Sequence, residues 1–334
     1  MLRGDSVPSF KHDRVTPAQI IILGFLLLIF TGAVLLMLPF STQEPGGASF
    51  GDALFTATSA TCVTGLVLHD TALYWSPFGQ LVILLLIQVG GMGVVTIAVA
   101  IFMFAGKRIG LKQRWVMQES ISAPQVGGIV RMTGFILKTA FLIEGIGALL
   151  LALRFCPQFG LGRGLWYAVF HSVSAFCNAG FDLMGVNSPF SSLTDYVGDP
   201  LVSNVIAFLI IIGGVGFLTW NDIREHKLHF RRYRLQSKLI LTTTLALILT
   251  GLLFFLLYEF EQGQWVDMSL WERINAAFFQ SVTPRTAGFN TVDLTGLSQP
   301  AQLLIILLML VGGAIGCILA VNPRSKAKMS PPQR

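Results

Sequence analysis

The chain has 334 residues, of which 53% are hydrophobic and only 12% charged, and its formal net charge at pH 7 is +6. Soluble globular proteins carry about 25% charged residues, so this composition argues against a water-soluble enzyme and favours a chain embedded in a lipid bilayer. None of the four cysteines forms a CxxC pair, which argues against a zinc site or a disulfide framework.

Apolar runs long enough to cross a bilayer, about 20 residues each, recur along the chain and predict membrane helices. The first is too long for the apolar core of a signal peptide, so we interpret it as a membrane helix. The runs form three consecutive pairs, at 20–38 and 80–104, at 135–153 and 201–220, and at 239–258 and 301–319.

Most of the 23 Lys and Arg residues lie in four segments outside these pairs, at 3–14, 107–138, 224–238 and 324–334. The positive-inside rule places such segments in the cytoplasm, together with the N-terminus. Because the basic segments flank membrane spans, we do not expect nucleic acid as a partner.

One short pattern occurs three times, once inside each pair of apolar runs. It reads FTATSATCVTG at 55–65, FHSVSAFCNAG at 170–180 and FQSVTPRTAG at 279–288, and the final glycines are 115 and 108 residues apart. Each copy is too short to span a bilayer. Since both flanking runs return the chain to the cytoplasm, each copy must enter and leave the membrane on the outer side.

We therefore predict an all-α membrane protein with three helix–re-entrant pore helix–helix repeats around a pseudo-symmetric pore. Non-helical backbone at membrane depth is tolerated only where protein or a water-filled cavity surrounds it. The predicted organisation is a cytoplasmic N-terminus (1–17), repeat one (18–105), a cytoplasmic loop (106–134), repeat two (135–220), a second cytoplasmic loop (221–238), repeat three (239–320) and an atypical tail (321–334).

The three short patterns also resemble a known family. TCVTG at 61–65 is similar to the first selectivity filter of the Trk/Ktr/HKT superfamily of potassium transporters, NAGF at 178–181 to the second, and QSVTPRTAGFN at 280–290 to the third. QSKLIL at 236–241 is closest to the Ktr membrane subunit, and the resemblance covers roughly 15–313. Residues that match the filters, whose backbone carbonyls would hold K⁺, are Thr61, Cys62, Val63, Thr64, Gly65, Cys177, Asn178, Ala179, Gly180, Thr286, Ala287 and Gly288.

The resemblance implies potassium uptake across the cell membrane by a multi-pass protein that is not an enzyme. Gly65 favours K⁺ over Na⁺, because serine at this position accompanies Na⁺ transport in the family. The family further implies a homodimer, a cytosolic nucleotide-binding regulatory ring docked on the basic loops, Na⁺ as a possible activator, and no covalently bound cofactor.

The family pattern has four repeats, which at this spacing would need roughly 440 residues. We therefore expect a chain truncated or frameshifted near Ala314, and its tail from Arg324 does not resemble the family. A non-conducting fragment is thus the main alternative function. A Na⁺-coupled secondary carrier is a weaker one, because carriers typically have inverted repeats and these three run the same way.

Two charged residues near the predicted spans have alternative roles. Glu144 lies inside a span and either forms a structural hydrogen bond or takes part in an ion path, the first being favoured. Arg285 follows the third pore helix, and we predict that it pairs with Asp293 behind the filter rather than facing K⁺.

Three further features have a packing role as the main prediction. His171 is expected to pack within the second pore helix. His69 and Asp70 belong either to an outer vestibule or to a solvated loop. The glycine clusters at 90–93, 213–216 and 312–316 lie inside apolar spans, so they predict close helix packing or helix bending rather than nucleotide loops.

Overall fold

The computed structural model describes residues 16–94, 96–99, 110–120, 128–227 and 229–320. Within these residues the chain is helical, and its one extended pairing is an isolated bridge between Thr42 and Trp75. The predicted all-α architecture is confirmed. The predicted tail at 321–334 and the N-terminus up to residue 15 lie outside the described residues.

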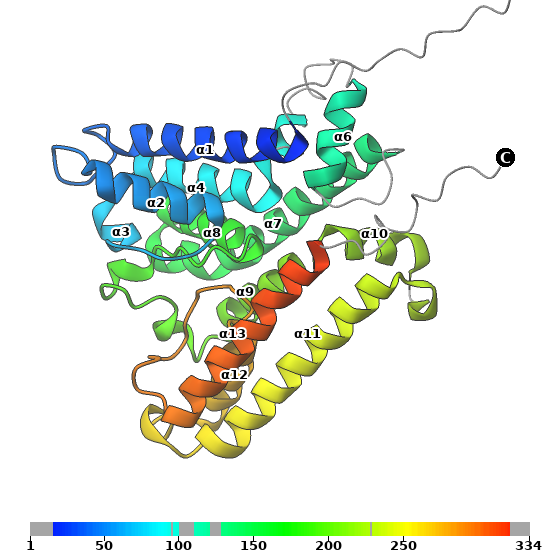
Figure 1. Ribbon diagram of the computed structural model, residues 1–334. Coiled ribbons are helices and arrows are strands. Elements are labelled where there is room, and N and C mark those ends of the chain that lie inside the picture. Colours follow the sequence, from blue (N-terminus) through cyan, green and yellow to red (C-terminus); the bar gives the residue numbers. More distant parts are fainter. Residues whose placement is uncertain (1–15, 95, 100–109, 121–127, 228, 321–334) are drawn as a thin grey trace, which may run out of the picture.

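The described helices follow one order three times, a helix, a shorter helix and a third helix. Figure 1 shows the first group, in blue and cyan, at one end of the molecule and the last, in yellow and red, at the other. The groups, named units 1 to 3, are α1 (Pro17–Leu36), α2 (Phe50–Cys62) and α4 (Pro77–Met92); α7 (Ile129–Phe159), α8 (Leu161–Phe176) and α9 (Pro200–Gly214); and α11 (Leu235–Phe254), α12 (Leu270–Val282) and α13 (Gln299–Ala320).

Shorter elements connect these helices. Two α-helices, α6 and α10, lie in the segments predicted to be cytoplasmic loops or at their edges, whereas α3 lies between α2 and α4. The bounds are α3 (Thr71–Tyr74), α6 (Leu111–Ser120), α10 (Phe217–His226), the 3₁₀ turns η1 (Met184–Val186), η2 (Thr194–Tyr196), η3 (Phe230–Arg232) and η5 (Gly263–Trp265), and a π turn η4 (Phe255–Glu259) that continues α11.

Several helices begin at a polar cap followed by proline, as their sequences favour. Thr16 precedes Pro17, and its side chain accepts a hydrogen bond from the Gln19 N–H. Ser76 precedes Pro77, and its side chain accepts a hydrogen bond from the Gly79 N–H. Such caps satisfy amide donors that have no partner in the first turn, and proline loses nothing there because its missing N–H would be unpaired.

The main buried cluster joins units 1 and 2 and extends into unit 3. It contains Trp75, Phe155 and Phe170, and it reaches α12 of unit 3 and the residue after the third glycine through Phe279 and Phe289. A second cluster lies within unit 3. Many large apolar side chains on α1, α7, α11 and α13 are exposed, as expected for helices that face lipid.

The outgoing helices of the first two units are shorter than the sequence predicted. The predicted span 80–104 is broken at Gly93, where α4 ends, and the span 201–220 is broken between α9 and α10, which bend by 89°. Gly93 and Gly216 both have φ of 84°, a conformation that interrupts a helix and that glycine adopts readily. Within the described residues, three helices are long and apolar enough to span a membrane, or four if α9 and α10 form one span. Helix α4 and the part of α13 from Gln299 to Gly313 are shorter apolar helices.

The second unit begins earlier than predicted. Helix α7 starts at Ile129, inside the predicted loop 106–134, and runs for 31 residues. At 1.5 Å per residue it is about 46 Å long, whereas the hydrocarbon core of a bilayer is about 30 Å thick. Its first turns, which carry Arg131, are therefore long enough to project beyond the apolar layer.

The glycine clusters bring outgoing helices against the ends of the short helices. A Cβ on Gly90 would overlap the carbonyl oxygen of Thr61, and one on Gly213 would overlap that of Phe176. Gly312 is less tight, since its Cβ would lie 3.3 Å from the Pro284 oxygen. The prediction that these glycines serve close packing is confirmed.

This contact predicts a position-specific stability effect. Gly213→Ala should destabilise the protein by about 1–3 kcal/mol, because the added methyl group must displace backbone of α8. Gly145→Ala in α7 is the matched control, since nothing lies within 4 Å of its added Cβ. Thermal unfolding of the purified protein in detergent should show a lower Tm only for the first variant, and equal Tm values would contradict the packing role.

Candidate functional site

Each short helix ends in a non-helical stretch that leads to a glycine. We call these stretches the return segments, residues 63–65, 177–180 and 283–288. In each, a non-glycine residue with positive φ is followed two positions later by a glycine with positive φ. The pairs are Val63 (57°) and Gly65 (76°), Asn178 (57°) and Gly180 (70°), and Thr286 (64°) and Gly288 (82°).

This shared conformation sets the return segments apart from helices and strands. The residue between each pair does not have a positive φ, so the sign of φ alternates along the segment. Positive φ is costly for a β-branched residue such as Val63, and strain of this sort gathers at functional sites.

The three glycines lie next to one another. A Cβ on Gly65 would lie 2.7 Å from the Ala179 oxygen, and one on Gly180 would lie 2.7 Å from the Ala287 oxygen. A Cβ on Gly288 would lie 2.9 Å from the Gly180 Cα. Segments more than 100 positions apart in sequence therefore meet backbone to backbone, with no room for a side chain.

A hydroxyl group near the end of each short helix holds the return segment in place. The hydroxyl donates to the carbonyl of the residue just after the glycine, from Ser59 to Leu66 (2.7 Å), from Ser174 to Phe181 (2.6 Å) and from Thr283 to Phe289 (2.5 Å). The backbone carbonyl of the same Ser or Thr accepts a backbone N–H from within the segment. These N–H donors are Thr64 to Ser59 (2.9 Å), Ala179 to Ser174 (2.8 Å) and Ala287 to Thr283 (3.1 Å).

The third unit keeps these hydrogen bonds although its hydroxyl residue lies one position closer to its glycine. Six positions separate Ser174 from Gly180, but only five separate Thr283 from Gly288. The backbone hydrogen bond of the third unit accordingly joins residues four positions apart instead of five. The geometry thus follows the hydrogen bonds rather than the residue count.

Two of the residues matched to the family filters lie outside the return segments, because Thr61 and Cys62 are the last residues of α2. Cys177, the first residue of the second segment, is the C-cap of α8. Val63, Thr64 and Gly65 lie beyond the helix, as do the matched residues of the other two segments. The C-terminal ends of α2, α8 and α12 therefore point their partial negative charges toward the gathered segments.

The predicted ion pair of Arg285 with Asp293 is wrong. Among the described residues, the Arg285 Nη1 atom is buried without a hydrogen-bond partner, and the guanidinium lies against Gly214 of α9. The Asp293 carboxylate instead accepts from the backbone and hydroxyl of Thr295, two residues away. The carboxylate of Asp293 finds its hydrogen-bond donors within its own turn. The short distance in sequence between Arg285 and Asp293 could not reveal this.

Glu144 forms the structural hydrogen bond that the sequence favoured. The Gln88 side-chain amide donates to both carboxylate oxygens, at 2.9 and 3.1 Å, and the Ser172 hydroxyl donates to the Glu144 backbone oxygen. Glu144 therefore connects α7 to α4 and α8. The amide of Gln88 was the partner that the sequence analysis missed.

His171 is fully buried and serves packing, as predicted. Its Nδ1 lies 2.7 Å from the Tyr167 oxygen, and the Leu183 N–H donates to Nε2. These partners fix the tautomer, with the proton on Nδ1, and fasten the loop after the second return segment to α8.

The loops that follow the return segments are joined from unit to unit. Asp70 caps α3 and also accepts the Phe190 N–H at 2.8 Å, so it ties the loop of unit 1 to the loop of unit 2. His69 stacks on Tyr74, with ring centroids 4.0 Å apart. Between units 2 and 3, the Asn290 N–H donates to the Ser192 hydroxyl.

Comparisons with known proteins agree with this architecture. The sequence model of the TrkH family, described as a cation transport protein, matches residues 7–322. The chain is 44% identical over 303 residues to the Ktr system potassium uptake protein B of Bacillus subtilis, and 41% identical over 305 residues to the potassium/sodium uptake protein NtpJ of Enterococcus hirae. These alignments cover 90% and 91% of this chain and 66% of each relative, so the chain spans about two thirds of the length of the curated relatives it matches.

A solved structure shows the same fold. The crystal structure of the potassium transporter TrkH from Vibrio parahaemolyticus matches with a TM-score of 0.63 and 18% sequence identity. The match covers 89% of this chain and 57% of that chain. At this identity the likeness concerns the fold alone.

The hydroxyl anchors predict a measurable loss of stability. Ser174→Ala leaves the buried Phe181 carbonyl without its donor, at a cost of about 1–3 kcal/mol. Thr58→Ala is the control, because the Thr58 hydroxyl is exposed and bonds only to Leu54 of its own helix. We expect a lower Tm in detergent for Ser174→Ala alone, and an unchanged Tm would argue against the anchoring role.

The loop after the second return segment predicts a pH effect. Burial raises the pKa of Asp182 to about 6, the charge of Asp70 adds to this, and the Met184 N–H opposes it. Between about pH 4 and 6 the folded chain therefore retains a proton that the unfolded chain has lost, so the free energy of unfolding falls as pH rises through this window.

Asp182→Asn should remove this contribution. The variant should be more stable than the parent above pH 6, and the difference should vanish near pH 4. Chemical denaturation at both pH values measures it. A constant difference between the two proteins at all pH values would contradict the raised pKa.

Proposed function

Because the chain belongs to the TrkH family of cation transport proteins, which are transporters and not enzymes, we propose that it is the membrane subunit of a Trk/Ktr-type potassium uptake system. One observation supports this above all others. Three return segments with the same alternating backbone meet at one point, each at the C-terminal end of a short helix.

In this proposal the carbonyl oxygens of the return segments replace the water around K⁺. A desolvated K⁺ needs several oxygens at once, and rings of backbone carbonyls supply them in potassium filters. In this proposal the alternating backbone turns the carbonyls of each segment toward the ion, where the segments touch at their glycines. The proposed ion-binding residues remain Thr61, Cys62, Val63, Thr64, Gly65, Cys177, Asn178, Ala179, Gly180, Thr286, Ala287 and Gly288.

The helix ends support a cation rather than an anion. Three C-terminal ends converge on the segments, and each carries a partial negative charge of roughly half an elementary charge. Arg285, which lies within the third segment and whose Nη1 atom is buried, opposes this field. We propose that its guanidinium is turned away from the ion path, toward Gly214 of α9.

The choice between K⁺ and Na⁺ belongs to the same proposal. One relative is named a potassium uptake protein and another a potassium/sodium uptake protein. Glycine at position 65 favours K⁺, since a side chain there would push into the Ala179 carbonyl. Na⁺ then acts at most as an activator of transport.

We further propose that the N-terminus and the basic segments face the cytoplasm, by the positive-inside rule. The predicted repeats would then occupy 18–105, 135–220 and 239–320, with cytoplasmic loops at 106–134 and 221–238. Assembly as a homodimer with a cytosolic nucleotide-binding ring completes the proposal.

The deciding experiment measures K⁺ uptake in cells that lack their own K⁺ uptake systems and express this chain. Growth at low K⁺ and uptake above the level of the empty vector support the proposal. If the protein inserts in the membrane at normal levels and uptake stays at that of the empty vector, this chain does not conduct K⁺ by itself.

A substitution at the first glycine tests the filter. Gly65→Ser should reduce the preference for K⁺ over Na⁺, because the new side chain meets the Ala179 carbonyl and strains a backbone with φ of 76°. Gly162→Ser is the control, since nothing lies within 4 Å of its Cβ. Competition of Na⁺ with K⁺ uptake measures the preference, and equal selectivity in the two variants would remove Gly65 from the filter.

A further inference from the structure

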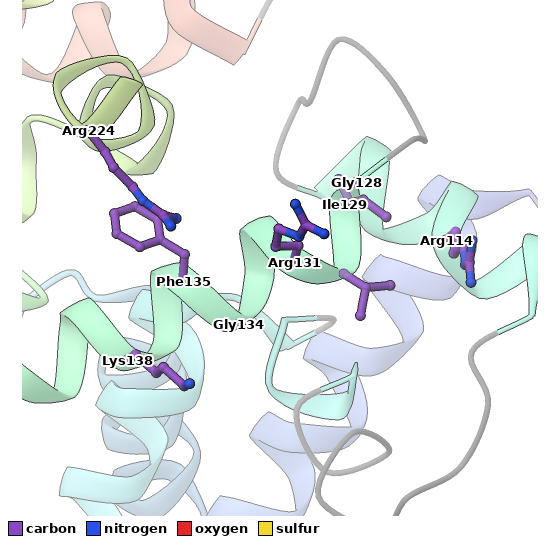
Figure 2. Close-up of a pocket in the computed structure, with 9 residues that line it drawn as sticks. Arg114, Gly128, Ile129, Arg131, Gly134, Phe135, Lys138 and Arg224 are labelled. Atoms are coloured by element: carbon purple, nitrogen blue, oxygen red, sulfur yellow. The ribbon is translucent and has the colours of Figure 1, made fainter. Parts of the chain in front are cut away.

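A basic cavity of about 810 Å³ lies far in sequence from the return segments, where α6, the first turns of α7 and α10 meet. Four cationic side chains surround it, Arg114, Arg131, Lys138 and Arg224. Figure 2 shows them on three separate helices around the same space. The described residues that line the cavity include no acid.

Three of the four cations have no ion pair within the described part of the chain, namely Arg131, Lys138 and Arg224. The Arg224 guanidinium lies 4.4 Å from the centroid of the Phe135 ring, which holds it in place without cancelling its charge (Figure 2). Like charges gathered in this way repel one another, so an anion bound among them would be stabilised.

The helix that supplies two of these cations continues into an exposed apolar stripe. Lys138 is followed at helical spacing by Leu142, Ile146, Leu149 and Leu153. Their side chains are 62%, 50%, 68% and 66% exposed. One face of α7 therefore passes directly from cationic to apolar, which is the order of headgroup and acyl chain in a phospholipid.

The length of α7 places this transition at the edge of the bilayer. A helix of 31 residues is about 16 Å longer than the hydrocarbon core. With the apolar stripe inside the core, the turns that carry Arg131 and Lys138 have room at headgroup level, where their charges avoid the cost of the hydrocarbon core. A soluble anion without acyl chains would make no contact with the apolar stripe.

From these observations we infer that the cavity binds the phosphate headgroup of an anionic phospholipid, whose acyl chains lie along the exposed face of α7. Basic pockets between membrane helices on the cytoplasmic side bind such headgroups. Because the cations come from α6, α7 and α10, one headgroup would connect three helices that the chain joins only through loops and the break after α9. The inference concerns lipid binding and does not depend on ion conduction.

The test uses the full chain, purified in detergent and stripped of lipid. Phosphatidylglycerol and phosphatidylcholine are titrated separately, and bound lipid is measured by native mass spectrometry. We expect tighter binding of phosphatidylglycerol. Each cation near a membrane surface contributes about fivefold in affinity, so Arg131→Gln, Lys138→Gln and Arg224→Gln combined should weaken its binding on the order of a hundredfold.

A matched variant controls for net charge. Arg163→Gln, Arg231→Gln and Arg232→Gln also remove three exposed cations, but none of them lines the cavity. Phosphatidylglycerol binding should fall by much less in this variant. An equal loss in the two triple variants, or equal affinity of the parent for the two lipids, overturns the inference.

Two further arms separate the remaining explanations. Inorganic phosphate should compete only weakly, because it lacks acyl chains for the α7 stripe. If it displaces phosphatidylglycerol at similar concentration, the cavity takes a free anion and the lipid assignment is wrong. If the cavity triple variant fails to fold, Arg224→Gln alone, at an exposed position, should still weaken binding about fivefold, and unchanged affinity would contradict the inference.

Discussion

Three stretches of irregular backbone inside an apolar fold impose the constraint on which this structure depends. An unpaired carbonyl in such a place costs several kcal/mol. One hydroxyl per unit, from Ser59, Ser174 or Thr283, donates to the first carbonyl beyond the glycine and so holds the segment against the short helix. The glycines meet backbone to backbone, and the outgoing helices carry Gly90 and Gly213 where they pass the short helices.

The loops beyond the glycines extend this arrangement from unit to unit. Asp70 connects unit 1 to unit 2 through Phe190, and Asn290 connects unit 3 to unit 2 through Ser192. Deeper in the fold, Glu144 and Gln88 join α7 to α4. The return segments are therefore held from both sides, by the helices before them and by the loops after them.

The sequence predicted the features that repeat, because repetition makes a weak local signal recognisable. The short helices and the close packing of glycine were all found in this way. It did not identify which glycine of a cluster breaks the helix. Gly90 continues a helix and Gly93 ends one, and only the φ angle, set by tertiary packing, tells them apart. The charge pattern likewise did not locate the start of a helix, since Arg131 lies inside α7 rather than in a loop.

Side-chain partners were the least predictable part of the site. Arg285 and Asp293 are close in sequence and opposite in charge, yet each has a different environment. Gln88 and Glu144 are 56 positions apart and bond directly. Pairing depends on which helix faces come together, and no local pattern encodes that.

The third return segment differs from the others by one residue, and all three belong to a single polypeptide. In an assembly of identical subunits, a substitution would be copied to every equivalent segment. Here a codon change alters one of three touching backbones and leaves the others as they were. The three segments can therefore differ in sequence while they keep the same pattern of φ angles and the same hydroxyl anchors.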